Sequence, residues 1–168
     1  MSKELKIYTY ASPVLKKKTE CLQFIGEEER AFFSSMVEIM HKANGVGLAA
    51  NQVGVNKQML VIDIGTGIIK IANPKIIKKA GRVSQEEGCL SLPDIVVKVC
   101  RAKDIVVAGI NEHNQSVKFD AHDLLARVFQ HEVDHLNGKL IIDYAPWHRK
   151  LLLKADFSKA RKKALRLN

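Results

Sequence analysis

The chain has 168 residues, of which 46% are hydrophobic and 27% charged, which is typical of one globular domain with a sizeable core. It contains no run of about 18 apolar residues, so we expect no membrane span, and residues 1–10 lack the apolar core of a signal peptide, so we expect a cytoplasmic protein. The net charge is +9, and from Arg149 onward there are eight Lys or Arg and a single acid. We therefore expect a basic helix at about 147–168 on an otherwise near-neutral domain.

The cysteine content agrees with a cytoplasmic location. The three cysteines, at positions 21, 89 and 100, are odd in number and show no C-x-x-C spacing. This pattern argues against a disulfide framework and fits a reducing compartment.

The first 52 residues predict a strand, a helix and a small-residue segment. Residues 6–9 predict a short strand. Residues 27–44 predict a helix, because acids crowd the first turn, apolar residues recur at helical spacing and Gly45 ends the pattern. Residues 45–52 contain two glycines and two alanines, so the backbone of a ligand or of another strand can approach closely. An ordinary turn would have the same composition, and no Gly-Lys-Ser/Thr follows to indicate a phosphate-binding loop.

The middle of the chain predicts antiparallel strands. Residues 58–64 and 67–73 are rich in β-forming residues and flank a short Gly-containing turn, which predicts a hairpin that ends before Pro74. Further candidate strands lie at 95–99, 104–110, 116–121 and 139–144. Strands grouped before a helix, with helices towards each end, indicate an α+β fold, in which antiparallel sheets pack around a central helix within a single domain 1–168.

That central helix is expected between Asp123, which can cap its start, and Gly138, which ends it. It carries the pattern H-E-x-x-H. Because an α-helix has about 3.6 residues per turn, His131 and His135 share one face and can bind one metal ion. Glu132 is rotated by about 100° from His131, so it flanks the metal and can act as general base on a metal-bound water. Two histidines on a core helix can have this spacing by coincidence, but the Glu after the first His favours a metal site.

A catalytic site of this kind generally takes three protein ligands and keeps one position open for water. Candidates for the third ligand are the cysteines at 89, 21 and 100, the histidines at 41, 113 and 122, and several acids. Cys89 is favoured because it follows a glycine and precedes a strand-like segment, where a thiolate can point inward. The other two cysteines lie in amphipathic stretches, where thiols are more often buried and unreactive.

Three short motifs occur in order along the chain: G-V-G-L-A-A-N-Q at 45–52, E-G-C-L-S at 87–91 and Q-H-E-V-D-H at 130–135. H-E-x-x-H alone would indicate only a metallohydrolase. Together the three motifs resemble the signature of the peptide deformylases. They cover about a tenth of the chain, and the similarity in length, spacing and strand-rich middle extends over nearly all of it.

The resemblance implies an enzyme that hydrolyses the formyl group from N-formylmethionine of newly made polypeptides and releases formate. It implies one divalent metal ion, Fe(II) in most members, with Zn, Ni or Co able to replace it. It assigns metal binding to Cys89, His131 and His135, and acid/base catalysis on the metal-bound water to Glu132. The residues expected to hold the oxyanion are Gln52 and, through its backbone N–H, Leu90. The residues expected near the substrate are Val46, Gly47, Glu87, Leu124, Arg127 and Val128.

One stretch departs from the family pattern. Many members carry an Arg a few residues after the Leu-Pro of the second motif, whereas residues 94–98 contain none and the next is Arg101. This difference concerns how the later residues of a peptide are held and leaves the metal chemistry intact.

Two other functions fit part of the pattern. H-E-x-x-H also occurs in metallopeptidases that cut internal bonds, but Cys89 within E-G-C-L-S favours the deformylase. A structural metal site in an RNA-binding module would fit the basic tail, but structural sites are normally closed by four ligands. For the tail itself we weigh a solvated helix face against a contact with ribosomal RNA, and we expect no DNA or membrane partner.

Overall fold

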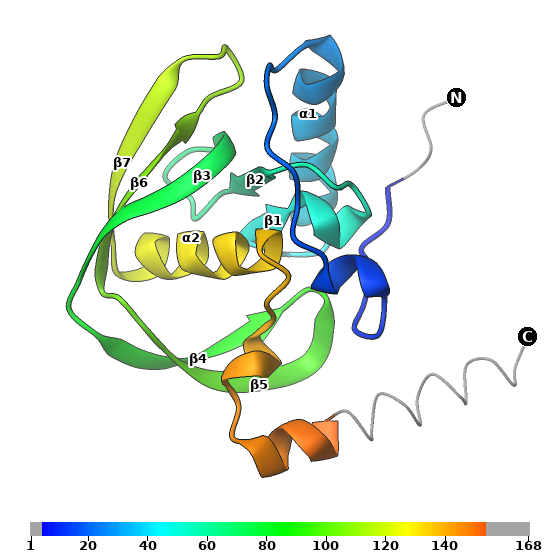
Figure 1. The fold of residues 1–168 in the computed structure, drawn as a ribbon, viewed down its shortest axis with the longest axis vertical. Helices are drawn as coiled ribbons and strands as arrows, with labels where there is room; N and C mark the ends of the chain where they lie inside the picture. Colours follow the sequence, from blue (N-terminus) through cyan, green and yellow to red (C-terminus); the bar gives the residue numbers. More distant parts are fainter. Residues whose placement is uncertain (1–4, 154–168) are drawn as a thin grey trace, which may run out of the picture.

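The computed structural model of the chain describes residues 5–153. The strands in this range are β1 (Gly47–Ala49), β2 (Met59–Ile62), β3 (Ile69–Ala80), β4 (Val83–Cys89), β5 (Leu92–Arg101), β6 (Asp104–Ile110) and β7 (Ser116–His122). The helices are α1 (Glu27–Lys42) and α2 (Asp123–Leu136), with short 3₁₀ helices η1 (Pro13–Lys16), η2 (Ala50–Val53) and η3 (Ile141–Tyr144). The predicted α+β class with antiparallel sheets is confirmed, and α2 lies at the centre of the molecule (Figure 1).

The strands form two antiparallel sheets. Five of them lie in the order β1-β2-β3-β6-β7, and β4 pairs with β5 as a separate hairpin. The predicted hairpin is the β2–β3 pair, in which Met59 lies opposite Ala72. The sequence predicted that the strand ends before Pro74, but β3 continues through this residue. Pro74 lies where the β3–β6 register shifts, a position that tolerates the missing N–H.

Strand β2 places a core on each face of the large sheet. Its four residues are fully buried, and their side chains alternate between the two faces. Met59 and Val61 pack into the cluster that α1 covers. Leu60 and Ile62 pack into the cluster that α2 covers. The continuous apolar run of β2 is therefore the pattern of a strand with a helix on each side.

Helix α2 ends at a position that requires glycine. Gly138 has a φ of +72°, and a Cβ at this position would lie 2.5 Å from the backbone oxygen of Lys16. The predicted stop at Gly138 is therefore confirmed. The predicted cap at the other end is wrong, because Asp123 is the first helical residue and His122 occupies the N-cap without a side-chain hydrogen bond.

Two predicted strands do not form within residues 5–153, and one observed strand was not predicted. Residues 6–9 form no strand, and the segment predicted as a last strand is η3. Strand β4 was not predicted, because its sequence, Val-Ser-Gln-Glu-Glu-Gly-Cys, has only one residue of high β propensity. It forms a strand through pairing with β5.

The last predicted helix begins at residue 147 and continues to 153, and its remainder lies outside the described residues. Within residues 5–153 no helix is long and apolar enough to span a bilayer.

Candidate metal centre and active site

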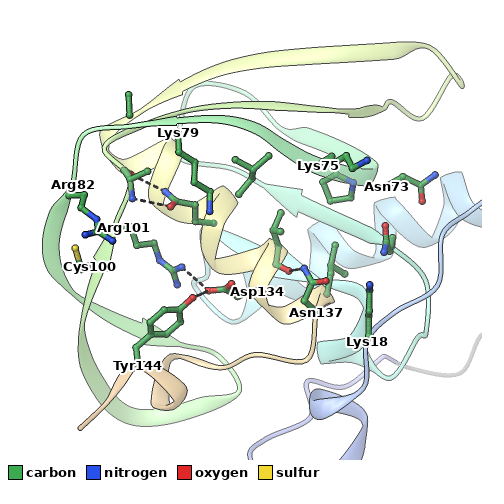
Figure 2. A pocket seen from close by; sticks show the side chains of 18 of the residues that line it. Lys18, Asn73, Lys75, Lys79, Arg82, Cys100, Arg101, Asp134, Asn137 and Tyr144 are labelled. Carbon is green, nitrogen blue, oxygen red and sulfur yellow. Dashed lines mark hydrogen bonds and ion pairs between the residues drawn. The ribbon is translucent and has the colours of Figure 1, made fainter.

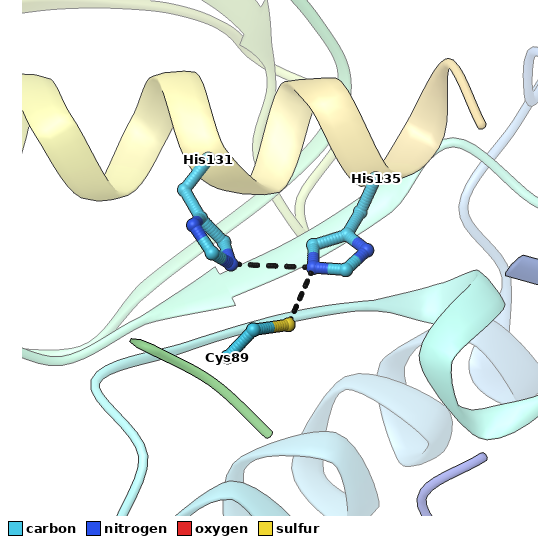
Figure 3. Close-up of side chains that lie close together, drawn as sticks. All are labelled: Cys89, His131 and His135. Carbon is cyan, nitrogen blue, oxygen red and sulfur yellow. Dashed lines mark hydrogen bonds between the residues drawn. The ribbon is translucent and has the colours of Figure 1, made fainter. Parts of the chain in front are cut away.

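Three candidate metal ligands come together between α2 and the end of β4. The ligand atoms of Cys89, His131 and His135 all lie within 4.8 Å of one another (Figure 3). The Nε2 atoms of the two histidines are 3.2 Å apart, and Cys89 Sγ is 3.1 Å from His135 Nε2. Metal–nitrogen bonds of roughly 2.0–2.1 Å at tetrahedral angles place two ligand nitrogens about 3.3 Å apart, so this donor set fits one divalent transition-metal ion.

Both histidines direct Nε2 towards the other candidate ligands. Burial would lower the pKa of His131, but the neighbouring Cys89, Glu87 and Glu132 raise it to about 10, so a metal ion must displace a proton from this ring. The Nδ1 of His131 lies 3.1 Å from Glu87 Oε2, so a proton on Nδ1 is held by the carboxylate and Nε2 is left for the metal. Burial and the neighbouring His131 hold the pKa of His135 well below its usual 6.5, so its imidazole is neutral.

Glu87 is the centre of a buried ionic network. Its carboxylate accepts two hydrogen bonds from Arg101, at 2.7 and 2.9 Å, and one from Arg127, at 2.5 Å. Arg101 also donates to Asp134, at 2.7 Å. Burial alone would raise the pKa of Glu87, but the hydrogen bonds from His131 and Arg101 lower it to about 2. Glu87 is therefore charged, both of its carboxylate oxygens are hydrogen-bonded within the protein, and it orients the candidate metal ligand His131.

The candidate base lies beside the three candidate ligands and is almost fully buried at the bottom of a cavity. Glu132 is 3% exposed, and its Oε2 has no hydrogen-bond partner. Burial raises the pKa of this carboxyl to about 7. A buried oxygen with no protein partner and a pKa near neutrality is what a group that binds a reacting water requires.

The backbone of β1 comes unusually close to this carboxylate. A Cβ added at Gly47 would lie 2.5 Å from Glu132 Oε1 and 2.8 Å from Val128 Cγ1. Only glycine allows β1 and α2 to pack at this distance, so the small-residue segment seen in the sequence serves a close approach between strand and helix.

Gln52 has a fixed amide orientation. Its Oε1 accepts a hydrogen bond from the backbone N–H of Ala49, at 2.8 Å. Its Nε2 therefore points the other way, towards Ser91 Oγ at 3.2 Å and Cys89 Sγ at 3.9 Å. The side chain presents a neutral N–H donor next to the candidate metal ligands.

These groups open onto one cavity of about 410 Å³, within the usual size range of a small-ligand pocket. The residues predicted from the sequence that line it are Val46, Gly47, Gln52, Glu87, Cys89, Leu90, Leu124, Arg127, Val128, His131 and Glu132. His135 lies beneath it, 1% exposed. Arg127, like Glu87, is bound within the protein, through Glu87 and the carbonyl groups of Val99 and Val83. None of residues 94–98 contributes to the lining.

Three contributors to this site were not singled out from the sequence. They are Arg101, Asp134 and Ser91. Arg101 lies at the far end of β5, 14 residues from Glu87, so only the β4–β5 pairing brings the two together. The only local signal was that a strand with a β-branched run ended in an arginine.

One Cys and two His side chains that can bind a metal ion, beside a buried carboxylate, are the arrangement of a metal-dependent hydrolase. Residues 4–150 match the family model described as polypeptide deformylase. The peptide deformylase of Halothermothrix orenii is 45% identical over 141 residues, which cover 83% of this chain and 92% of that protein. A crystal structure of a peptide deformylase from Legionella pneumophila has a TM-score of 0.89 at 32% identity and covers 98% of this chain and 99% of that one. A second, from Synechococcus elongatus in complex with actinonin, has a TM-score of 0.85 at 35% identity and covers 95% and 87%.

The chain therefore belongs to the peptide deformylase family, hydrolases that remove the formyl group from N-formylmethionyl peptides. The family is metal-dependent, in agreement with the cluster of Cys89, His131 and His135.

The role of Glu87 predicts a specific effect on metal affinity. Glu87→Gln removes the charge that holds the proton on His131 Nδ1, so we expect the metal to bind about 10–100-fold more weakly. Competition with a chromogenic chelator measures this on protein whose folding has been verified by circular dichroism. Glu86→Gln is the matched control, because Glu86 is the next residue along β4 and its exposed carboxylate makes no bond to the network. Equal affinities of the two variants would contradict the role.

Proposed function

We propose that this chain removes the formyl group from N-formylmethionine of new polypeptides at the centre described above. In this proposal Cys89, His131 and His135 hold one divalent metal ion. The observation that carries it is the enclosed triad of ligand atoms beside the unpartnered carboxylate of Glu132. A bound divalent ion lowers the pKa of water from about 15.7 to roughly 7, which makes hydroxide available near neutral pH.

Glu132 moves the proton in this scheme. Its buried carboxylate takes a proton from the attacking water and returns it to the leaving amine of methionine. A pKa near 7 lets the same group accept and release a proton at neutral pH. The reaction converts the formamide and water into formate and a free amine.

The developing oxyanion is stabilised by two neutral donors. Gln52 Nε2 is one of them, since the N–H of Ala49 fixes its orientation. The backbone N–H of Leu90, directly after Cys89, is the other. Loss of one such donor in an oxyanion hole commonly raises the barrier by about 2.7–4 kcal/mol.

The substrate main chain lies along β1, and its methionine side chain enters the cavity. β1 is the edge of the five-stranded sheet, so an extended peptide can add beside it with Val46 and Gly47 in contact. Leu124 and Val128 form an apolar wall for the methionine side chain. Glu87 and Arg127 support this wall from behind, because both are bound to other groups of the protein.

The test of the function is formate release from an N-formylmethionyl tripeptide, with protein prepared anaerobically and loaded with Fe(II). Glu132→Ala should lower the rate about 10²–10⁴-fold at equal metal content, since general acid–base catalysis typically contributes that much. Glu38→Ala, an exposed carboxylate on α1, should turn over like the wild type. Absence of formate from fully metallated wild-type protein would refute the proposal.

For the native metal we propose Fe(II), with Zn, Ni or Co able to occupy the same ligands. An Fe(II)–thiolate centre is oxidisable at both the metal and Cys89. The Fe(II) form should therefore lose most of its activity in air, and the Ni(II) form, in which only the thiolate is readily oxidised, should lose activity more slowly, as followed by timed formate assays beside anaerobic controls. An Fe(II) form that stays fully active after prolonged exposure to air would count against iron as the native metal.

We also propose that the chain works in the cytoplasm and contacts the ribosome through its basic C-terminal residues. Residues 158–168 contain five Lys or Arg and no acid, which gives salt-sensitive affinity for RNA phosphates. Deletion of these residues should weaken ribosome binding in a co-sedimentation assay by about tenfold at moderate salt. Turnover of a free tripeptide serves as the control and should not change. Unaltered co-sedimentation would refute the contact.

A further inference from the structure

A second and larger cavity lies on the opposite side of α2 from the metal centre. Its volume is about 1030 Å³, at the upper end of the roughly 300–1,000 Å³ of ordinary small-molecule pockets. The α2 residues that line it include Gln130 and Asp134, whereas His131 and Glu132 face the other cavity. A ligand here would leave the metal centre open.

Four exposed cations line this second cavity. Lys75 and Lys79 come from β3, Lys18 from the segment after η1, and Arg82 from the turn before β4. In Figure 2, Lys79 and Lys18 reach into the cavity from opposite sides. Across residues 5–153, no ion pair or hydrogen bond to any of the four side chains is found, although lysines elsewhere, such as Lys70 with Glu112, are paired. Their charges are therefore uncompensated.

Among residues 5–153, the lining of the cavity also contains no free negative group. Its one acidic lining residue, Asp134, accepts hydrogen bonds from Arg101 and from the hydroxyl of Tyr144, each at 2.7 Å. Four free cations around a neutralised carboxylate produce a concentrated positive potential, because a concave protein surface focuses the field of its charges. This positive potential favours a ligand that carries several negative charges.

The available hydrogen-bonding groups distinguish between two kinds of anionic chain. A peptide brings a backbone N–H with every residue, and each N–H needs an acceptor. The lining amides are largely used: Asn73 bonds both backbone groups of Leu22, and Gln58 bonds Cys21 and Thr19. A phosphodiester backbone brings acceptors to unpaired donors. Tyr144 is 41% exposed at this cavity; Arg101 covers one face of its ring, which leaves the other face as a surface on which a base can stack.

We propose that this cavity binds the phosphate backbone of single-stranded RNA, with Lys18, Lys75, Lys79 and Arg82 as the phosphate contacts. The contact is independent of sequence, because a phosphate contact carries no information about the bases. It is also independent of deformylation, since α2 separates it from the metal centre.

The test is fluorescence anisotropy of a labelled oligouridylate of about 12 nucleotides, a length typical of single-strand sites, bound to the full chain over a range of salt. The cavity variant is Lys75→Gln/Lys79→Gln. The matched control is Lys42→Gln/Lys118→Gln, which removes the same charge from exposed lysines outside the cavity and leaves the basic tail in place. All proteins are also assayed for formate release from a free tripeptide.

We expect the cavity variant to bind RNA roughly tenfold more weakly at about 0.1 M salt and to reduce the slope of log affinity against log salt by about 1.4, because each single-strand phosphate contact contributes about 0.7. The control should bind like the wild type, and all three should release formate alike. The proposal is overturned if the wild type does not bind RNA, or if both double variants weaken binding equally. It is also overturned if polyglutamate of equal charge binds as tightly as RNA with the same dependence on the two lysines.

Discussion

The buried carboxylate of Glu87 is the group on which the arrangement of the site depends. It joins β4 to β5 through Arg101, to α2 through Arg127 and to a candidate metal ligand through His131. Removing one partner from such a buried ion pair typically destabilises a protein by about 3–5 kcal/mol, because the remaining charges stay desolvated. The small hairpin has few apolar contacts to α2, so this network takes the place of a hydrophobic core at the point where Cys89 must meet the helix.

Features encoded locally were the ones that could be predicted. Helix α2, its H-E-x-x-H face and its end at Gly138 follow from spacing over one segment, as do the paired strands β2 and β3. The network could not be predicted, because Arg101 and Glu87 meet only when β4 pairs with β5, and β4 itself has little intrinsic preference for a strand. Asp123 illustrates a different limit: its side chain is a good cap, yet the chain enters α2 one residue earlier, from His122.

Helix α2 separates two environments of different character. One face presents neutral and anionic groups that suit a metal ion, with Glu132 and His135 both nearly inaccessible to water. The other face borders a wide, positively charged hollow in which Asp134 is the single acid. The side chain of Arg101 links the two faces, because it bonds Glu87 on one side and Asp134 on the other. A substitution at Arg101 would therefore remove hydrogen bonds from Glu87 on one face and from Asp134 on the other.

Strand β1 has only three residues and lies at an edge of its sheet. With a rise of about 3.3 Å per residue, its exposed edge spans roughly 10 Å, enough backbone to pair with the first two or three residues of an extended chain. An edge this short also gives other sheets little to join, which limits aggregation. In the proposed binding mode, the length of β1 sets how many residues of a polypeptide the enzyme contacts through its backbone. A hydrolase that inspects so little of its substrate is suited to act on every protein the cell makes, whatever sequence follows the initiating methionine.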